Sequence, residues 1–122
     1  CNCEGDMRET GQIDYVELPS KDIEVTKKFF SEAFGWSFVD YGPDYVAIEG
    51  AGLNGGFYKS EKVSQTGNGS VLVVIYSSEL ESTLGSVKSA GGRIVQEIFS
   101  FPGGRRFHFC DPNGNEYAVW SE

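Results

Sequence analysis

The sequence predicts an α+β fold built from two copies of a strand–helix–three-strand (βαβββ) unit. Strand-like and helix-like hydrophobic periodicities follow one another in the same order twice along the chain. A constant offset of 57 residues relates the two runs, as for Ile23 and Leu80 or Thr26 and Thr83. Neither unit alone covers both its helix and its sheet, so we expect the two units to share one core.

The first run begins with a strand over residues 13–18. Pro19 is expected to end this strand because proline lacks a backbone donor. Asp22 then offers a side-chain oxygen to open a helix, and Gly35 ends that helix. Further strands are predicted at 36–41, at 45–49 and around 57–58, with a flexible glycine-containing stretch over 50–56.

The second run follows a polar segment over residues 59–70, which is predicted to be a linker. A strand is predicted over 71–76, and a helix over 79–90 whose apolar residues recur at helical spacing. The glycines at 91 and 92 end the helix, and a strand is predicted over 93–99.

A hairpin closes the second run, and its turn is Asp111-Pro112-Asn113-Gly114-Asn115. Each of these residue types suits a turn, because they accept local hydrogen bonds, fix φ or tolerate a left-handed backbone. The flanking strands alternate in two-residue steps. One face therefore takes Phe107 and Phe109 while His108 lies on the other, and Glu116, Ala118 and Trp120 share a face opposite Tyr117 and Val119.

Composition excludes several classes of function. Eighteen acidic and ten basic residues give a formal charge of −8, which repels phosphate backbones, so no nucleic-acid partner is expected. We expect no membrane partner, since no apolar run is long enough to span a bilayer and no signal-peptide pattern opens the chain. A cytoplasmic location follows by default. The charge either keeps the protein soluble or steers a cationic ligand towards it.

The remaining expectations concern the start of the chain and its cysteines. Residues 1–11 are expected to be a disordered or tail segment, followed by a single domain over 12–122 with repeat units at 12–58 and 71–121. The three cysteines, Cys1, Cys3 and Cys110, cannot form a disulfide framework. Cys110 is expected to be a small buried residue.

Five segments of the chain occur in an order and spacing typical of one known family: Asp22-Ile23, Phe29-Phe30 with Phe34-Gly35-Trp36, Leu53-Asn54-Gly55-Gly56, Gly91-Gly92 and the turn at 111–115. Together they resemble the glyoxalase/bleomycin-resistance/dioxygenase superfamily, also called vicinal oxygen chelate proteins. The resemblance spans about residues 12–121. Members of this superfamily form a curved eight-stranded sheet with helices on the convex side and a ligand cavity on the concave side, often as a dimer.

The metalloenzymes of this superfamily hold a divalent metal with His or Glu from the first and last strand of each unit. The resemblance places those positions at Tyr15, Leu72, Gly55 or Gly56, and Ala118. None of these is a usual ligand for such a metal, apart from a remote role for Tyr15. The chain also holds one histidine, His108, so a two-histidine site cannot form within one chain. We therefore expect no metal site and no cofactor.

The resemblance also selects candidate ligand-binding residues. By the family's register, Tyr15 and Glu17 should face the cavity, together with Trp120. Glu17 and His108 are the candidate catalytic residues, because a carboxylate in an apolar cavity or an imidazole can move a proton near neutrality. Arg105 and Arg106 either bind an anionic ligand or offset part of the acidic surface. The full predicted pocket comprises Tyr15, Glu17, Leu72, Glu116 and Trp120.

The leading hypothesis is a glyoxalase-like protein without the family's metal site, forming a homodimer and binding a small aromatic or cationic organic ligand in the concave cavity. Two alternatives stay open. One is an enzyme of the lyase, isomerase or dioxygenase type from the same superfamily, which would work through Glu17 or His108, or with a metal in an unexpected place. The other is a drug-sequestering protein like those that confer bleomycin resistance, which suits the charge of −8.

Overall fold

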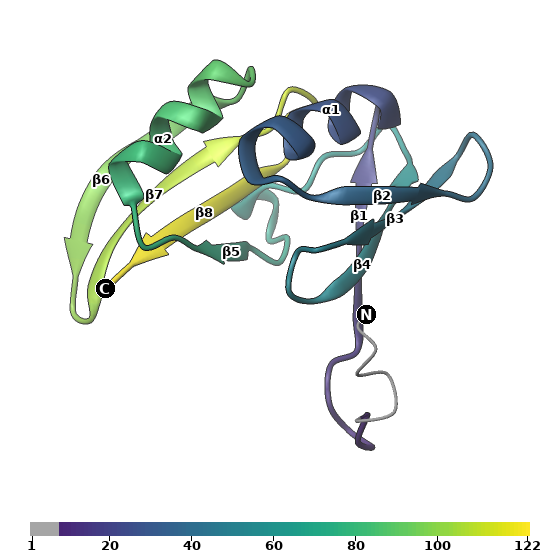
Figure 1. Cartoon of the computed structure of the whole chain (residues 1–122), viewed down its shortest axis with the longest axis horizontal. Helices are drawn as coiled ribbons and strands as arrows, with labels where there is room; N and C mark the ends of the chain where they lie inside the picture. The colour runs from purple at the N-terminus through teal and green to yellow at the C-terminus, as the bar shows by residue number, and fades with distance from the viewer. Residues whose placement is uncertain (1–7) are drawn as a thin grey trace.

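A computed structural model of the chain describes residues 8–122 and confirms the α+β class (Figure 1). Two units follow one another along the chain, each with the order β, α, β, β, β. The first unit consists of β1 (Tyr15–Ser20), α1 (Ile23–Phe34), β2 (Ser37–Asp40), β3 (Tyr45–Glu49) and β4 (Asn54–Lys59). The second unit consists of β5 (Val73–Tyr76), α2 (Leu80–Ser89), β6 (Arg93–Phe101), β7 (Gly104–Cys110) and β8 (Glu116–Ser121).

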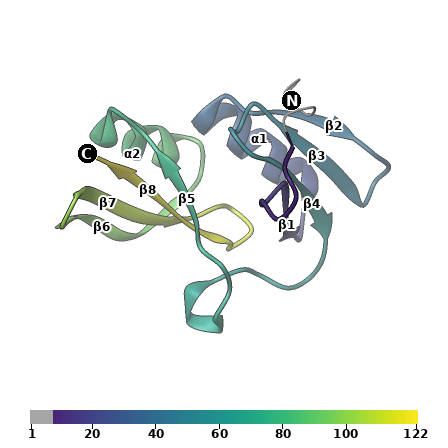
Figure 2. The same cartoon turned by 90° about the horizontal axis from the view of Figure 1, so that it is seen from below.

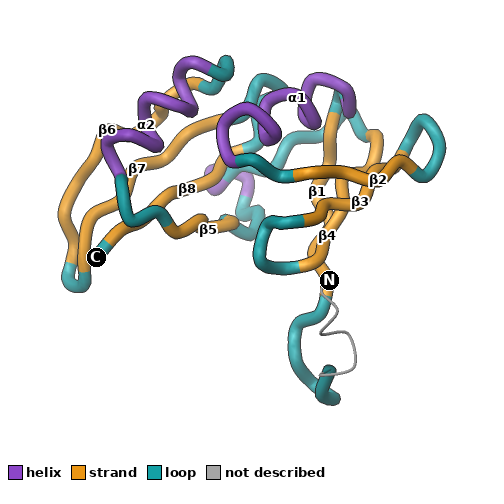
Figure 3. Tube along the Cα trace, viewed as in Figure 1, coloured by secondary structure: helices purple, strands orange, loops and turns teal. Residues whose placement is uncertain are grey.

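The eight strands form two four-stranded sheets with the same internal order. The first sheet runs β1-β4-β3-β2 and the second runs β5-β8-β7-β6. In each sheet the first strand of the unit pairs in parallel with the last strand, and the other pairings are antiparallel. Figure 2 shows the two units side by side, and both helices lie on the same side of the sheets in Figures 1 and 3.

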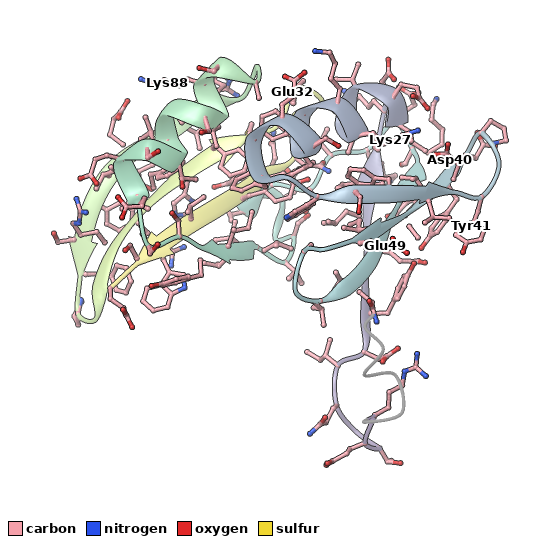
Figure 4. The ribbon with its side chains drawn as sticks, in the orientation of Figure 1. Lys27, Glu32, Asp40, Tyr41, Glu49 and Lys88 are labelled. Atoms are coloured by element: carbon pink, nitrogen blue, oxygen red, sulfur yellow. The ribbon has the colours of Figure 1, made fainter. Side chains whose placement is uncertain are left out.

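Local sequence signals explain where the helices begin and end. The Asp22 side chain accepts a hydrogen bond from the Val25 amide at 3.3 Å, and Gly35 ends α1 with a φ of 74°. Gly91, just after α2, has a φ of 106°. Lys27 of α1 is paired with Asp40 at the end of β2, where Figure 4 labels both side chains.

Two local predictions in the first unit were wrong. Pro19 lies within β1 instead of ending it, because β1 is an edge strand and pairs only with β4. Gly55 and Gly56 lie within β4 instead of a flexible stretch. A Cβ at Gly55 would lie 2.6 Å from the Val16 carbonyl oxygen, so the strand needs a glycine there to pack this closely.

One hydrophobic core joins the two units, as expected. Phe30 of α1 contacts Tyr117 of β8, with ring centroids 5.1 Å apart, and Phe29 lies 5.8 Å from Phe109 of β7. Phe29, Phe30 and their partners are at most 1% exposed. Helix α1 therefore covers part of the second sheet as well as its own, and the burial of these rings stabilises the arrangement of the two units.

The turn between β7 and β8 connects the second unit to the end of β1 and to the first turn of α1. The Asn115 amide donates to the Pro19 carbonyl at 2.7 Å, and its oxygen accepts from the Ser64 amide at 2.9 Å. Asn113 donates to the Thr26 hydroxyl at 2.8 Å. Burial raises the pKa of Asp111, which accepts from Tyr117. The turn predicted from the sequence therefore also makes contacts that hold the units together.

The segment between the two units contains a short 3-10 helix at Thr66–Asn68. It is held to the second unit by the Ser64 amide, which donates to Asn115, and by the Thr66 amide, which donates to Glu116. Of the predicted tail at 1–11, residues 1–7 lie outside the described residues, and residues 8–11 form no helix or strand. Among the helices of residues 8–122, none is long and apolar enough to cross a membrane.

Candidate functional site

The face of the first sheet that points away from α1 carries a hydrogen-bonded array of three side chains. The Tyr15 hydroxyl lies 2.6 Å from the Tyr45 hydroxyl, and Tyr45 donates to Oε2 of Glu17 at 3.0 Å. Burial, followed by the hydrogen bonds to Tyr15 and Glu17, raises the pKa of Tyr45 far above its usual value. Tyr45 therefore stays protonated and acts as a donor to Glu17.

The array exists because a glycine lies beneath it. Gly56 of β4 pairs with Glu17 on one side and Ala47 on the other. A Cβ at Gly56 would overlap the Tyr45 hydroxyl and lie 2.9 Å from the Val46 carbonyl oxygen. The phenol of Tyr45 thus fills the space above Gly56, which is one of the positions from which the metalloenzymes of the resembled superfamily hold their metal.

The residues at the four expected metal positions do not fit a metal ion. Tyr15 is engaged with Tyr45, Gly56 is covered by Tyr45, and Ala118 is fully buried. Leu72 lies just before the start of β5. Within the described residues 8–122, no group of three or more His, Cys, Asp or Glu side chains is placed to hold a metal.

The corresponding face of the second sheet carries a different polar chain. Nδ1 of His108 lies 3.0 Å from Oε2 of Glu116, and Arg106 lies within hydrogen-bonding distance of Nε2 of the same ring, at 3.1 and 3.3 Å. The other Glu116 oxygen, Oε1, accepts from the Thr66 amide at 2.9 Å and the Thr66 hydroxyl at 2.8 Å. The side chains of His108 and Glu116 are 12% and 13% exposed.

The Glu116 carboxylate is stabilised by these donors. Burial by itself would raise the pKa of Glu116, but the hydrogen bonds from Thr66 and His108 outweigh burial and lower it. Glu116 is therefore ionised near neutral pH and holds the His108 ring by Nδ1. Phe99 of β6 stacks on the imidazole, with centroids 6.0 Å apart, so both the position and the plane of the ring are fixed.

The remaining candidates take separate places. Trp120 of β8 lies against Tyr76 of β5, with ring centroids 5.3 Å apart, and Tyr76 is 51% exposed. Arg105 donates to both carboxylate oxygens of Glu81 on α2, at 2.6 and 3.3 Å. Of the two arginines weighed together in the sequence, Arg105 therefore faces the helix side and Arg106 the open side, as the two-residue period of β7 requires.

The predicted pocket residues thus fall into two groups on different sheets. Tyr15 and Glu17 meet through Tyr45, whereas Glu116 meets His108 and Trp120 meets Tyr76. A groove of about 560 Å³ adjoins the first group and runs between β1 and the 62–73 segment. Its lining includes Glu17, Tyr58, Lys62 and Val71.

Sequence reasoning missed two members of these groups. The first is Tyr45, whose hydroxyl contacts with Tyr15 and Glu17 depend on the pairing of β3 with β4. Thr66 lies in the segment between the units, where no periodicity indicates a role. The separation of Arg105 from Arg106 was available from strand alternation.

Comparisons with known proteins identify the family of this chain. Residues 12–119 match the family described as Glyoxalase/Bleomycin resistance protein/Dioxygenase superfamily. A "Glyoxylase-like domain-containing protein" of Didymella fabae is 28% identical over 122 residues, covering 89% of this chain and 92% of that protein.

Two solved structures illustrate the shared fold. A glyoxalase-related enzyme from Fulvimarina pelagi has a TM-score of 0.76 at 18% identity, covering 92% of this chain and 88% of that one. A mutant fosfomycin resistance protein from Listeria monocytogenes, complexed with Mn(II) and 1S,2S-dihydroxypropylphosphonic acid, has a TM-score of 0.75 at 18% identity, covering 93% and 91%. The chain belongs to the glyoxalase/bleomycin resistance protein/dioxygenase superfamily.

Proposed function

We propose that this protein binds a small organic ligand on the open faces of its two sheets and does so without the metal that other members of its superfamily use. The proposal is carried by one observation, the Tyr15–Tyr45–Glu17 array above Gly56. That array replaces a metal-holding corner with phenols and one carboxylate. Such groups bind organic ligands by hydrogen bonds and by contact with a ring face.

The groove beside β1 gives the ligand a place to lie. Its volume of about 560 Å³ is within the range of small-molecule sites. Glu17 belongs both to the array and to the lining of the groove, so its carboxylate can contact a ligand there. Tyr58 adds a half-exposed aromatic ring to the same lining. A cationic or aromatic ligand suits this combination.

Tyr15, Glu17, Leu72, Glu116 and Trp120 remain the proposed ligand-binding residues, in two groups. The first sheet contributes the acidic and phenolic contacts through Tyr15 and Glu17. The second sheet contributes Glu116 and Trp120, with Leu72 at the approach to β5. Drug sequestration is the second binding hypothesis, in which the Glu17 carboxylate binds a cationic drug.

Metal content is the first test. Elemental analysis of the purified full chain should find no stoichiometric transition metal, and titration with Mn²⁺ or Zn²⁺ should show no saturable binding. A bound metal in a one-to-one ratio with the chain would contradict the proposal.

Ligand binding is the second test. Thermal-shift measurements against matched cationic, neutral and anionic aromatic compounds should identify at least one that stabilises the protein, because a ligand that binds the native state raises its stability. For a cationic aromatic ligand, Glu17→Gln should weaken binding about tenfold. Glu49→Gln is the matched control, since Glu49 is an exposed carboxylate at the end of β3 (Figure 4).

A further inference from the structure

Arg106 differs from the other cations that lack a carboxylate partner. Among the ion pairs formed within residues 8–122, Arg106 takes part in none. Lys21, Lys62, Lys88 and Arg93 also form none there, but they are exposed to solvent, whereas Arg106 is partly buried. Its guanidinium lies over the Phe101 ring, 5.9 Å from the centroid. A partly buried cation without a counter-ion is available to an anion.

The contacts of His108 determine which ring nitrogen carries the proton. A guanidinium has donors and no acceptor, so the Arg106 contacts at Nε2 require an unprotonated nitrogen there. The proton must then be on Nδ1, which donates to Glu116. Two independent contacts therefore give the same neutral tautomer. Among the contacts of the described residues, the lone pair of His108 Nε2 accepts hydrogen bonds only from Arg106.

Few other charged groups surround the imidazole. From β8 the facing group is the Glu116 carboxylate. From β6, Phe99 packs on the ring and Gln96 pairs with His108 in the register, and neither is charged, while the cation Arg93 lines the same pocket as Glu116. From β7 itself the neighbour is Arg106. The segment between the units reaches the ring only through Thr66, which holds Glu116. Movement of Arg106 would therefore leave Glu116 as the charged group in contact with His108.

The surroundings favour an anion with an apolar body. Ala118, directly across from His108 in the register, is small, and Trp120 lies directly across from Arg106. Phe99 and Phe101 border the same pair from β6. A carboxylate attached to an aromatic ring would place its charge at Arg106 and its ring among these side chains.

We propose that Arg106 and His108 form a binding site for an aromatic carboxylate, and that binding draws one proton onto His108. The carboxylate takes the guanidinium, which releases Nε2. Nε2 then takes up a proton from solvent, and the new Nε2–H donates a hydrogen bond to the carboxylate of the ligand. Nδ1–H continues to donate its hydrogen bond to Glu116. No covalent bond of the ligand is made or broken, and the added positive charge lies between two carboxylates.

This inference rests on the proposed function, because both require open sheet faces that bind organic compounds. It concerns different residues, so the two can fail separately. If no compound of any charge stabilises the protein, both fail. If a cationic compound binds through Glu17 but benzoate binds without involving Arg106, only this inference fails.

The first experiment uses nuclear magnetic resonance of the imidazole nitrogens in the full chain, with benzoate as the probe. His108 is the only histidine, so its signals need no assignment. Without benzoate the spectrum should show the Nδ1–H tautomer, and saturation with benzoate should convert it to the doubly protonated ring. An Nε2–H tautomer in the free protein, or an unchanged ring at saturating or millimolar benzoate, would overturn the proposal.

The second experiment is calorimetric titration with benzoate in buffers of different ionisation enthalpy. Proton uptake should appear as a buffer-dependent enthalpy close to one proton per benzoate. Arg106→Gln should weaken benzoate binding by about tenfold or more, since it removes a charge-assisted contact. Arg105→Gln is the matched control, because Arg105 lies on the same strand but pairs with Glu81, and it should leave binding unchanged. Equal losses in both variants, or no buffer dependence, would contradict the proposal.

Discussion

The two units of this protein share a backbone plan and differ in what they place on it. In each unit a serine at the end of the first strand or just after it is hydrogen-bonded to a threonine in the first turn of the helix. The two bonds are Ser20 to Thr26 at 2.8 Å and Ser77 to Thr83 at 2.7 Å. The open faces of the sheets have diverged. The first carries phenols and a carboxylate, whereas the second carries the pair of Arg106 with His108.

Equivalent positions show how this divergence arises. Gly56 and Ala118 occupy the same place in their sheets, each paired with the first strand of its unit and with the strand on the other side. Above Gly56 there is room for Tyr45, while Ala118 is fully buried with His108 as its neighbour in register. The first sheet therefore has a glycine beneath Tyr45, whereas the second has the methyl group of Ala118 beside His108. The superfamily scaffold fixes the position, and the side chains determine the chemistry.

The turns before the last strands differ as well. Residues 50–53 of the first unit are Gly, Ala, Gly and Leu, which have no polar side chains. The second unit has Asp111, Asn113 and Asn115. Asn115 donates to Pro19 of β1, Asn113 donates to Thr26 of α1, and Asp111 accepts from Tyr117 of β8. The second unit therefore holds the first by polar contacts, in addition to the core that they share.

The largest effect is expected from Asn115→Ala. Asn115 is 1% exposed, and its removal leaves the Pro19 carbonyl and the Ser64 amide without their partners. The free energy of unfolding should fall by about 3 kcal/mol, because each unpaired buried group costs about 1–3 kcal/mol. Urea unfolding measures this loss. Asn68→Ala is the control, since Asn68 is exposed. Equal stabilities of the two variants would show that the turn does not hold the units together.

A smaller loss is expected from Gly56→Ala, which makes the first sheet resemble the second at this position. The new Cβ would displace the Tyr45 hydroxyl and press on the Val46 carbonyl. Overpacking of this kind costs about 2 kcal/mol, and the Tyr15–Tyr45–Glu17 array should be lost with it. Denaturant unfolding gives the stability, and a crystal structure of the variant shows the Tyr45 position. Gly67→Ala is the control, because nothing lies near a Cβ there. An unmoved Tyr45 would contradict the role assigned to Gly56.

These comparisons also show how far the sequence predicts the molecule. The repeat, both helices and the closing hairpin follow from local signals such as Asp22, Gly35 and the 111–115 turn. The correct face of Arg106 follows from strand alternation. By contrast, the contact of Tyr45 with Gly56 depends on the register of three strands, and Thr66 reaches Glu116 across 50 residues of chain. Such long-range pairings leave no local pattern. Pro19 was misjudged because the sequence does not say which strand is an edge.

The smallest expected effect concerns the serine–threonine hydrogen bond that occurs at the equivalent position in each unit. Ser20 and Thr26 are at most 1% exposed and Asn113 donates to both, whereas Ser77 and Thr83 are partly exposed. Ser20→Ala should therefore cost about 1.5 kcal/mol and Ser77→Ala about 0.5 kcal/mol, because a lost partner matters most where water cannot replace it. Urea unfolding of the two variants side by side measures the difference. If Asn113→Ala reduces the cost of Ser20→Ala to that of Ser77→Ala, the turn of the second unit is what makes the two otherwise equivalent bonds unequal.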